Sequence, residues 1–67
     1  METFAIKFDG IDLLVYAYYH KGTNQFDDPT DIQSHEIRVE GVDIMALLPY
    51  EIIKSIEYDV IEKYELA

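Results

Sequence analysis

A nine-residue pattern that occurs twice is the feature that most restricts the fold. Residues 6–14 read Ile-Lys-Phe-Asp-Gly-Ile-Asp-Leu-Leu, and residues 37–45 read Ile-Arg-Val-Glu-Gly-Val-Asp-Ile-Met. In both copies an acidic residue followed by Gly separates two apolar segments. Gly tolerates the positive φ that a two-residue hairpin turn requires. The pattern therefore predicts two hairpin-like reversals and assigns each flanking residue to a face of a sheet.

The first copy predicts a hairpin with a defined register. A two-residue turn at Asp9-Gly10 places the apolar residues of segment 3–8 opposite those of segment 11–20, all on one face. The expected core-face pairs are Phe4 with Val15, Ile6 with Leu13, and Phe8 with Ile11, while Lys7 faces Asp12 on the opposite side.

The second copy allows alternatives. The same turn pairs Val39 with Val42 and Arg38 with Asp43. Glu is a poor residue for the first turn position because it resists positive φ. In this alternative, the Gly that follows marks a β-bulge or a simple bend and not a two-residue turn. In a further alternative, Asp43 caps one helical turn that continues through Leu48.

A helix is expected to begin at Pro49, because proline is tolerated at the first helical position. An apolar stripe of Ile53, Ile56, Val60 and Tyr64 follows at helical spacing. The fold class predicted for residues 1–67 is a single α+β domain. It has a three- to four-stranded antiparallel β-sheet with one C-terminal helix packed on one face, and residues 42–45 are the uncertain fourth strand.

The charge balance limits the classes of partner. Fourteen acidic and five basic side chains give a formal charge of −9. This charge excludes direct nucleic-acid binding, favours a protein partner with a basic surface, and also fits a role in solubility alone. There is no cysteine, secretory h-region or membrane-spanning apolar run. We expect a soluble cytoplasmic protein without a cofactor.

Two groups of residues are candidate partner-binding sites. One helix covers one sheet face, so Leu14, Tyr16 and Tyr18 are expected to remain open on the other. Tyr58 lies on the polar side of the helix among carboxylates, an arrangement that suits an arginine-rich partner. The carboxylates expected around Tyr58 are Glu51, Glu62 and Glu65.

The residues between the two copies suggest little chemistry. Residues 21–34 are expected to form a long loop, pinned to the body by Phe26 and Ile32. His20 and His35 bracket this loop but are expected on opposite sheet faces, so no metal site is predicted. The hydroxyl residues lack any nucleophile–base context, and a domain of this size is expected to have little room for a pocket. An enzyme is therefore not expected.

Residues 37–44 and the Leu-Leu-Pro-Tyr-Glu segment at 47–51 resemble those of small acidic accessory proteins encoded by bacteriophages and prophages. The resemblance covers residues 36–65 best and 4–14 more loosely. It implies a protein that binds and modulates a host protein, in some cases by presenting carboxylates where that protein expects phosphates. It transfers no catalytic residue.

Three hypotheses follow from the sequence. In the first, the chain is a non-enzymatic inhibitor or modulator whose helix and loop carboxylates, Glu57 and Asp59 among them, mimic a nucleic acid. In the second, the Tyr16/Tyr18 face forms a homodimer and the acidity only confers solubility. The third is a metal-dependent activity at His20 and His35.

Overall fold

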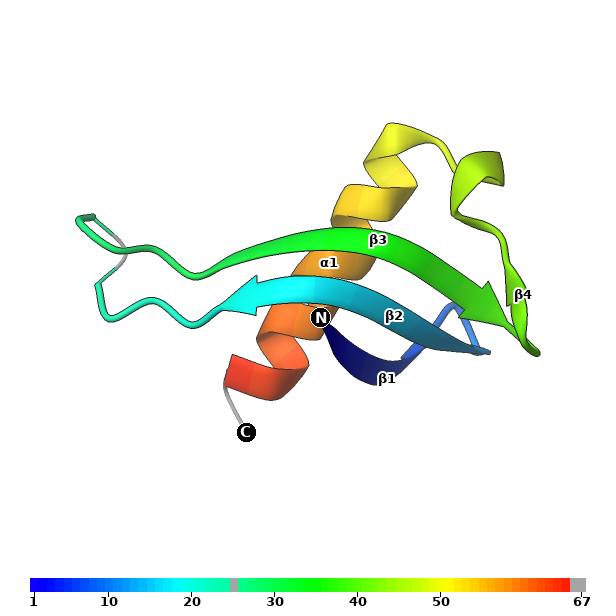
Figure 1. Cartoon of the computed structure of the whole chain (residues 1–67), viewed down its shortest axis with the longest axis horizontal. Coiled ribbons are helices and arrows are strands. Elements are labelled where there is room, and N and C mark those ends of the chain that lie inside the picture. The colour runs from blue at the N-terminus through cyan, green and yellow to red at the C-terminus, as the bar shows by residue number, and fades with distance from the viewer. Residues whose placement is uncertain (25, 66–67) are drawn as a thin grey trace.

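One sheet and one helix form the two layers of this computed structural model, which describes residues 1–24 and 26–65 (Figure 1). The strands lie in the order β1-β2-β3-β4, and every pairing between them is antiparallel. The predicted α+β class is confirmed, and the uncertain fourth strand is present as two residues. The elements are β1 (Glu2–Phe8), β2 (Ile11–His20), β3 (Asp31–Val39), β4 (Val42–Asp43), the 3₁₀ turn η1 (Met45–Leu47) and the helix α1 (Tyr50–Glu65).

The first hairpin has the predicted register. Lys7 pairs with Asp12, and the three expected apolar pairs are also present. Asp9 and Gly10 have φ values of 51° and 79°, as a type I′ turn requires. Ile11 differs from its prediction because it is 51% exposed. This residue follows the turn directly, at the tip of the hairpin, where it lines a surface hollow instead of packing in the core.

The second hairpin also forms its two-residue turn. Glu40 adopts the left-handed conformation at φ 50° and Gly41 follows at φ 81°, so neither a bulge nor a simple bend replaces the turn. A non-Gly residue in this region costs about 1 kcal/mol. A helical turn after Asp43 is present as well, as η1, but its N-cap residue is Ile44 and the turn ends at Leu47. The Asp43 carboxylate accepts a hydrogen bond from the Met45 amide at 3.0 Å.

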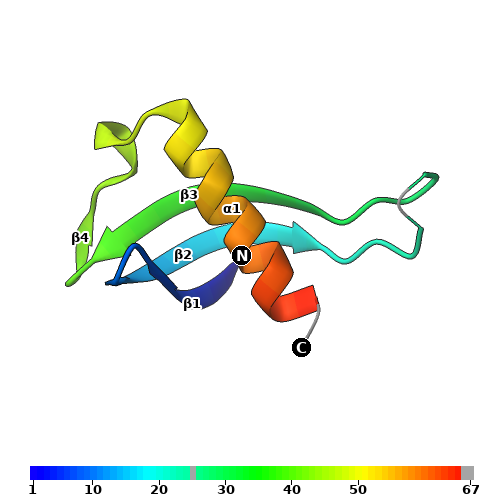
Figure 2. The ribbon, with the colours of Figure 1, turned by 180° about the vertical axis from the view of Figure 1, so that it is seen from behind.

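The core lies between α1 and one face of the sheet, as the view from behind shows (Figure 2). The Ile52 and Ile53 amides donate hydrogen bonds to the Pro49 carbonyl oxygen, both 3.1 Å, and α1 begins at Tyr50, one residue after the predicted start. Two residues of the predicted helical stripe are almost completely buried. The buried core residues are Phe4, Ile6, Leu13, Val15, Ala17, Ile32, Ile37, Ile56 and Val60.

Side chains of α1 form hydrogen bonds with backbone groups of both β1 and β3. The helix crosses the sheet diagonally, with its C-terminal end beside β1 (Figure 2). There the Tyr64 hydroxyl accepts a hydrogen bond from the Ala5 amide and donates one to the Ala5 carbonyl oxygen, both at 3.1 Å. The Lys63 ammonium donates to the same oxygen at 2.7 Å. Across the sheet, Glu57 accepts from the Ser34 amide of β3. These side chains act as partial substitutes for further strands.

Removing the hydroxyl group of Tyr64 tests this arrangement at β1. We expect Tyr64→Phe to lower the free energy of unfolding by about 1 kcal/mol, because the ring is retained while two hydrogen bonds to Ala5 are lost. Urea unfolding followed by circular dichroism measures the change. Tyr58→Phe is the matched control, since Tyr58 is 64% exposed on the same helix. Equal stability of the two variants would show that the Tyr64 hydroxyl contributes nothing.

Candidate functional site

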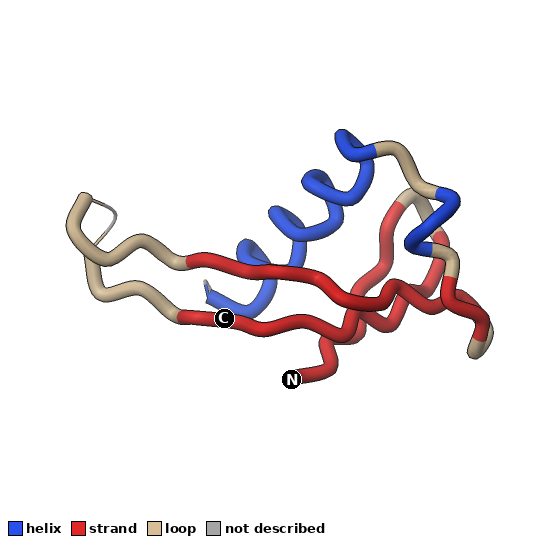
Figure 3. The backbone as a smooth tube through the Cα atoms, turned by 45° about the horizontal axis from the view of Figure 1, so that its top comes forward, coloured by secondary structure: helices blue, strands red, loops and turns tan. Residues whose placement is uncertain are grey.

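The sheet face opposite α1 carries the first group of candidate residues. Leu14 and Tyr18 are 40% and 58% exposed, and Tyr16 between them is half-buried. All three come from β2, whose alternate residues Leu13, Val15 and Ala17 lie in the core. Figure 3 shows the strands and the helix as separate layers, with α1 on one side of the sheet only. We call the uncovered side the open face.

Neighbouring side chains on β3 hold the aromatic rings of the open face in place. The Arg38 guanidinium lies 5.5 Å from the centre of the Tyr16 ring, and its Nε atom donates a 2.8 Å hydrogen bond to Glu36. The Tyr18 and His35 rings meet edge to face at 4.8 Å. The hydrogen bond with the Glu36 carboxylate also raises the pKa of Arg38. The open face is therefore an ordered surface with mixed aromatic and charged character.

A β-bulge changes the predicted position of His35. The β2–β3 register pairs Tyr16 with Glu36 but Ala17 with Ser34, so His35 is an extra residue in β3. Sequence alternation from the inward Ile37 places His35 in the core. That prediction is wrong, because the bulge turns its ring outward against Tyr18. The same shift lets Ile32 and Ser34 face inward.

No group of three or more His, Asp or Glu side chains within the described residues is arranged to hold a metal ion. His20 instead contacts Asp28 of the loop, with Nε2 and Oδ1 2.7 Å apart.

The second group of candidate residues lies on the opposite side of the molecule from the open face. Glu51, Tyr58 and Glu62 are exposed on α1, and the side chain of Glu65 is outside the described part of the structure. The helix separates these residues from Leu14, Tyr16 and Tyr18, since the inner surface of α1 packs on the core face of the sheet. The predicted partner-binding residues thus belong to two surfaces and not to one.

Glu57 does not belong to the acidic helix surface that the mimicry hypothesis requires. The residue is only 6% exposed. Its Oε2 atom accepts hydrogen bonds from the Ser34 amide at 3.0 Å and the Ser34 hydroxyl at 2.6 Å, and Lys54 lies 3.1 Å from Oε1. Burial acts to raise the pKa of Glu57, but the contacts with Ser34 and Lys54 outweigh it and lower the pKa. Glu57 is therefore a structural carboxylate that links α1 to β3.

The loop between β2 and β3 is shorter than predicted, because β3 already begins at Asp31. The loop extends away from the rest of the sheet (Figure 1). The prediction that Phe26 pins it to the body is wrong, since Phe26 is 84% exposed, whereas Ile32 is buried as part of β3. Local contacts order the loop instead. Asn24 and Asp28 exchange two backbone hydrogen bonds of 3.1 and 2.8 Å.

Asp28 is the centre of these loop contacts. Its carboxylate meets His20 on one oxygen and accepts hydrogen bonds from the amide and hydroxyl of Thr23 on the other, at 3.3 and 3.1 Å. The hydrogen bond with His20 is the largest cause of a lowered pKa for Asp28. Gly22 allows the two sides of the loop to approach closely, since a Cβ atom there would lie 2.1 Å from the Asp28 carbonyl oxygen. Asp28 therefore stabilises the conformation of this loop.

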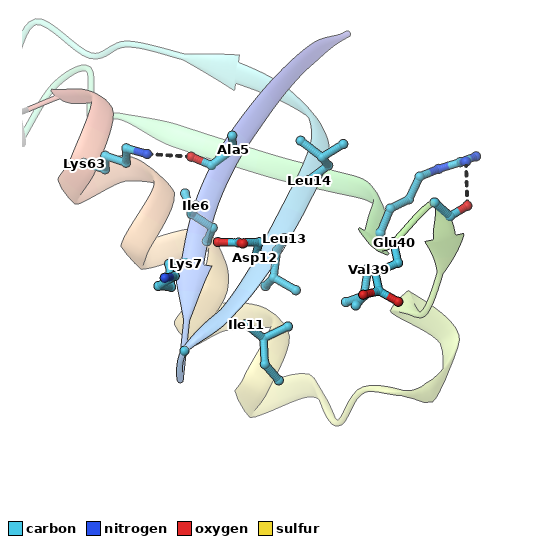
Figure 4. Close-up of a pocket in the computed structure, with 13 residues that line it drawn as sticks. Ala5, Ile6, Lys7, Ile11, Asp12, Leu13, Leu14, Val39, Glu40 and Lys63 are labelled. Atoms are coloured by element: carbon cyan, nitrogen blue, oxygen red, sulfur yellow. Dashed lines mark hydrogen bonds between the residues drawn. The ribbon is translucent and has the colours of Figure 1, made fainter.

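A hollow of about 730 Å³ lies at the hairpin end of the open face (Figure 4). It is larger than the small size of the domain led us to expect. Strands β1 and β2 provide most of its lining, including Ala5, Lys7, Asp12 and Leu14, and Arg38 completes one side. The lining that the structure describes contains no hydroxyl, imidazole or thiol group. The hollow has room for a side chain of a partner. Its lining therefore offers none of the usual nucleophile–base pairs.

Comparison with protein-family models, with curated proteins and with solved structures finds no match. None of the described helices is long and apolar enough to cross a membrane. The functional interpretation therefore depends on the geometry of the two candidate surfaces.

Proposed function

We propose that this chain is a non-enzymatic protein-binding module that uses the open face to bind a protein. In keeping with the resemblance to phage-encoded accessory proteins, we place it in the bacterial cytoplasm as a modulator or inhibitor of a host protein. The observation that supports the proposal is the row of Leu14, Tyr16 and Tyr18 on the face that α1 does not cover, in which Leu14 and Tyr18 are exposed and Tyr16 is half-buried. Tyrosine provides a large contact area at a low entropic cost.

The contacts around this row support the proposal. Arg38 packs on Tyr16 and His35 packs on Tyr18, so the two rings are held before any partner arrives. A pre-organised surface loses less conformational entropy on binding than a mobile one does. Tyrosine and arginine are also residues that often dominate the binding energy of an interface.

The acidic surface of α1 is a second candidate, favoured by Tyr58, which is 64% exposed. Glu51 and Glu62 lie on the same exposed side of the helix. Binding of a basic partner there would weaken as salt is added, because the attraction is between exposed charges. The burial of Glu57 removes one carboxylate from this surface. The helix therefore presents fewer carboxylates than the mimicry hypothesis requires.

A pair of uncharged variants separates the two surfaces. We expect the double variant Leu14→Gln/Tyr18→Gln to bind captured partners at least about tenfold more weakly than the wild type, because it removes exposed apolar contact area. Tyr58→Gln on the helix is the control, and this variant should retain the captured partners. The measurement is affinity capture from a bacterial lysate with quantitative mass spectrometry, after circular dichroism has shown that both variants fold.

The reverse result would contradict the proposal. Partners that survive the open-face substitutions but are lost with Tyr58→Gln would identify the helix as the binding surface. Capture that neither variant changes would remove both surfaces as candidates.

A further inference from the structure

The loop between β2 and β3 continues the antiparallel course of these two strands beyond their ends. We call its described residues, 21–24 and 26–30, the finger. Asn24 and Asp28 form an antiparallel bridge with two backbone hydrogen bonds, and the Asp28 carboxylate also contacts His20. The finger projects from the sheet at the end opposite to the two hairpin turns (Figure 1). These contacts give the finger a defined shape before a partner arrives.

Phe26 is the one aromatic residue in the sequence of this loop. Its backbone is held in place, because the Phe26 amide donates a 2.8 Å hydrogen bond to Oδ1 of Asn24. Its side chain is 84% exposed, the largest value among the large hydrophobic residues that the structure describes. The ring belongs neither to the core cluster nor to the described side chains packed against it. An aromatic side chain on a fixed backbone can fill a pocket of another molecule and bury a large apolar area there.

The base of the finger adjoins the open face. The alternation of β2 places His20 on the same side of the sheet as Tyr18, and the His20 Nε2 atom lies 2.7 Å from Oδ1 of Asp28 in the finger. A hollow of about 230 Å³ lies between them, with Tyr18, His20 and Asp31 in its lining. A partner that covers Tyr18 therefore also reaches the finger.

The finger and its base carry excess negative charge. Residues 20–31 contain three aspartates and one lysine, Lys21, with His20 counted as neutral. Asp27, which follows Phe26 directly, is exposed, and so is Asp31 at the start of β3. A complementary surface on the partner would therefore carry lysine or arginine side chains around the place where the ring enters.

We infer, on the basis of the proposed function, that the protein bound by the open face has an apolar pocket with a basic rim, and that this pocket receives the side chain of Phe26. The finger and the Tyr18 end of the open face then form one continuous interface with a single partner. Phe26 is the anchor, and Asp27 meets the basic rim. The bridge between Asn24 and Asp28 holds the finger before binding, which lowers the entropic cost of association.

Two substitutions of Phe26 test the pocket. The partner is first identified by capture with the wild type and then purified, and isothermal titration calorimetry gives its affinity for each variant. We expect Phe26→Gln to bind at least about tenfold more weakly than the wild type, because the apolar anchor is lost. Phe26→Leu keeps an apolar side chain and should retain most of the affinity. Phe26→Gln should unfold at the same urea concentration as the wild type, because the ring is exposed.

A pair of charge-neutralising variants tests the basic rim. We expect Asp27→Asn to weaken binding about two- to fivefold at low salt, the range typical of an exposed ion pair, and to have less effect at high salt. Asp9→Asn is the matched control. It removes the same charge at the opposite end of the sheet, in a turn position that suits asparagine, and it should bind as the wild type does. Equal affinities of the two variants would contradict the basic rim.

The outcomes separate this inference from the proposed function. Binding that is lost with Leu14→Gln/Tyr18→Gln but unchanged by Phe26→Gln would overturn the anchor and leave the proposed function standing. Binding that is lost only with Phe26→Gln would contradict the open face, and with it the continuous interface. Equal losses for Phe26→Gln and Phe26→Leu would overturn the apolar pocket in favour of a cation packed on the ring. A wild type that captures no protein would overturn both proposals.

Discussion

Ile37→Ala is expected to lower the free energy of unfolding by about 2–5 kcal/mol, the usual cost of removing a completely buried branched side chain. Ile37 is 0% exposed, pairs with Val15 of β2 and lies in the cluster that α1 covers. A domain of this length has a total stability of about 3–10 kcal/mol, so the variant should be partly or fully unfolded at moderate temperature. Thermal and urea unfolding followed by circular dichroism measures the loss.

Ile11→Ala is the matched control for this prediction. It removes the same atoms from a residue that is 51% exposed, so only a small loss of stability is expected. If the two alanine variants were equally stable, the core would not lie where the structure places it. A large loss for Ile11→Ala alone would mean that the tip of the first hairpin is buried in solution, for example by a second copy.

Glu57→Ala is expected to have the second largest effect, with a loss of about 2–4 kcal/mol. The substitution leaves the amide and hydroxyl of Ser34 buried without their acceptor, and it frees Lys54 from its partner. Glu62→Ala, on the exposed side of the same helix, is the control and should remain close to the wild type. Chemical unfolding of the two variants, together with Ser34→Ala in a double-mutant cycle, gives the coupling energy between α1 and β3.

The pH dependence of stability distinguishes a charged Glu57 from a neutral one. Because the folded state lowers the pKa of this carboxyl, its contribution is present above the pKa of the unfolded chain and is lost as the pH falls through the folded value. We therefore expect the wild type to lose more stability than Glu57→Ala on acidification. Asp28, whose pKa is also lowered, remains in both proteins and cancels from the comparison. Parallel curves would show that Glu57 does not act through its charge.

The two hairpins could be predicted from the sequence because each depends on local chemistry. An acidic residue followed by Gly fits a two-residue turn, and the alternation of apolar residues then determines the register. This reasoning also located the open face, since Leu14, Tyr16 and Tyr18 alternate with core residues. The helix was predictable for a similar reason, because its apolar stripe follows directly after Pro49.

The positions that sequence reasoning placed wrongly depend on contacts between distant segments. The bulge at His35 is visible only when β3 is paired with β2, because alternation within one strand cannot reveal an extra residue. Glu57 was assigned to an acidic surface, and its burial follows from where α1 crosses β3. The sequence carried no signal for this contact, because Ser34 faces inward only as a result of the bulge at His35.

The other source of error was the exposure of a large apolar residue in the loop between β2 and β3. Phe26 was expected to pack because large apolar residues usually do, but the Asn24–Asp28 contacts close the loop without it.

The contact between the C-terminal part of α1 and Ala5 joins residues that are 59 positions apart. During synthesis on the ribosome, β1 and the first hairpin emerge well before Lys63 and Tyr64 do. For that interval the amide and carbonyl of Ala5 lack their side-chain partners and remain accessible to a strand of another nascent chain. Translation that pauses before the helix has left the exit tunnel would therefore increase the risk of misassembly between neighbouring chains.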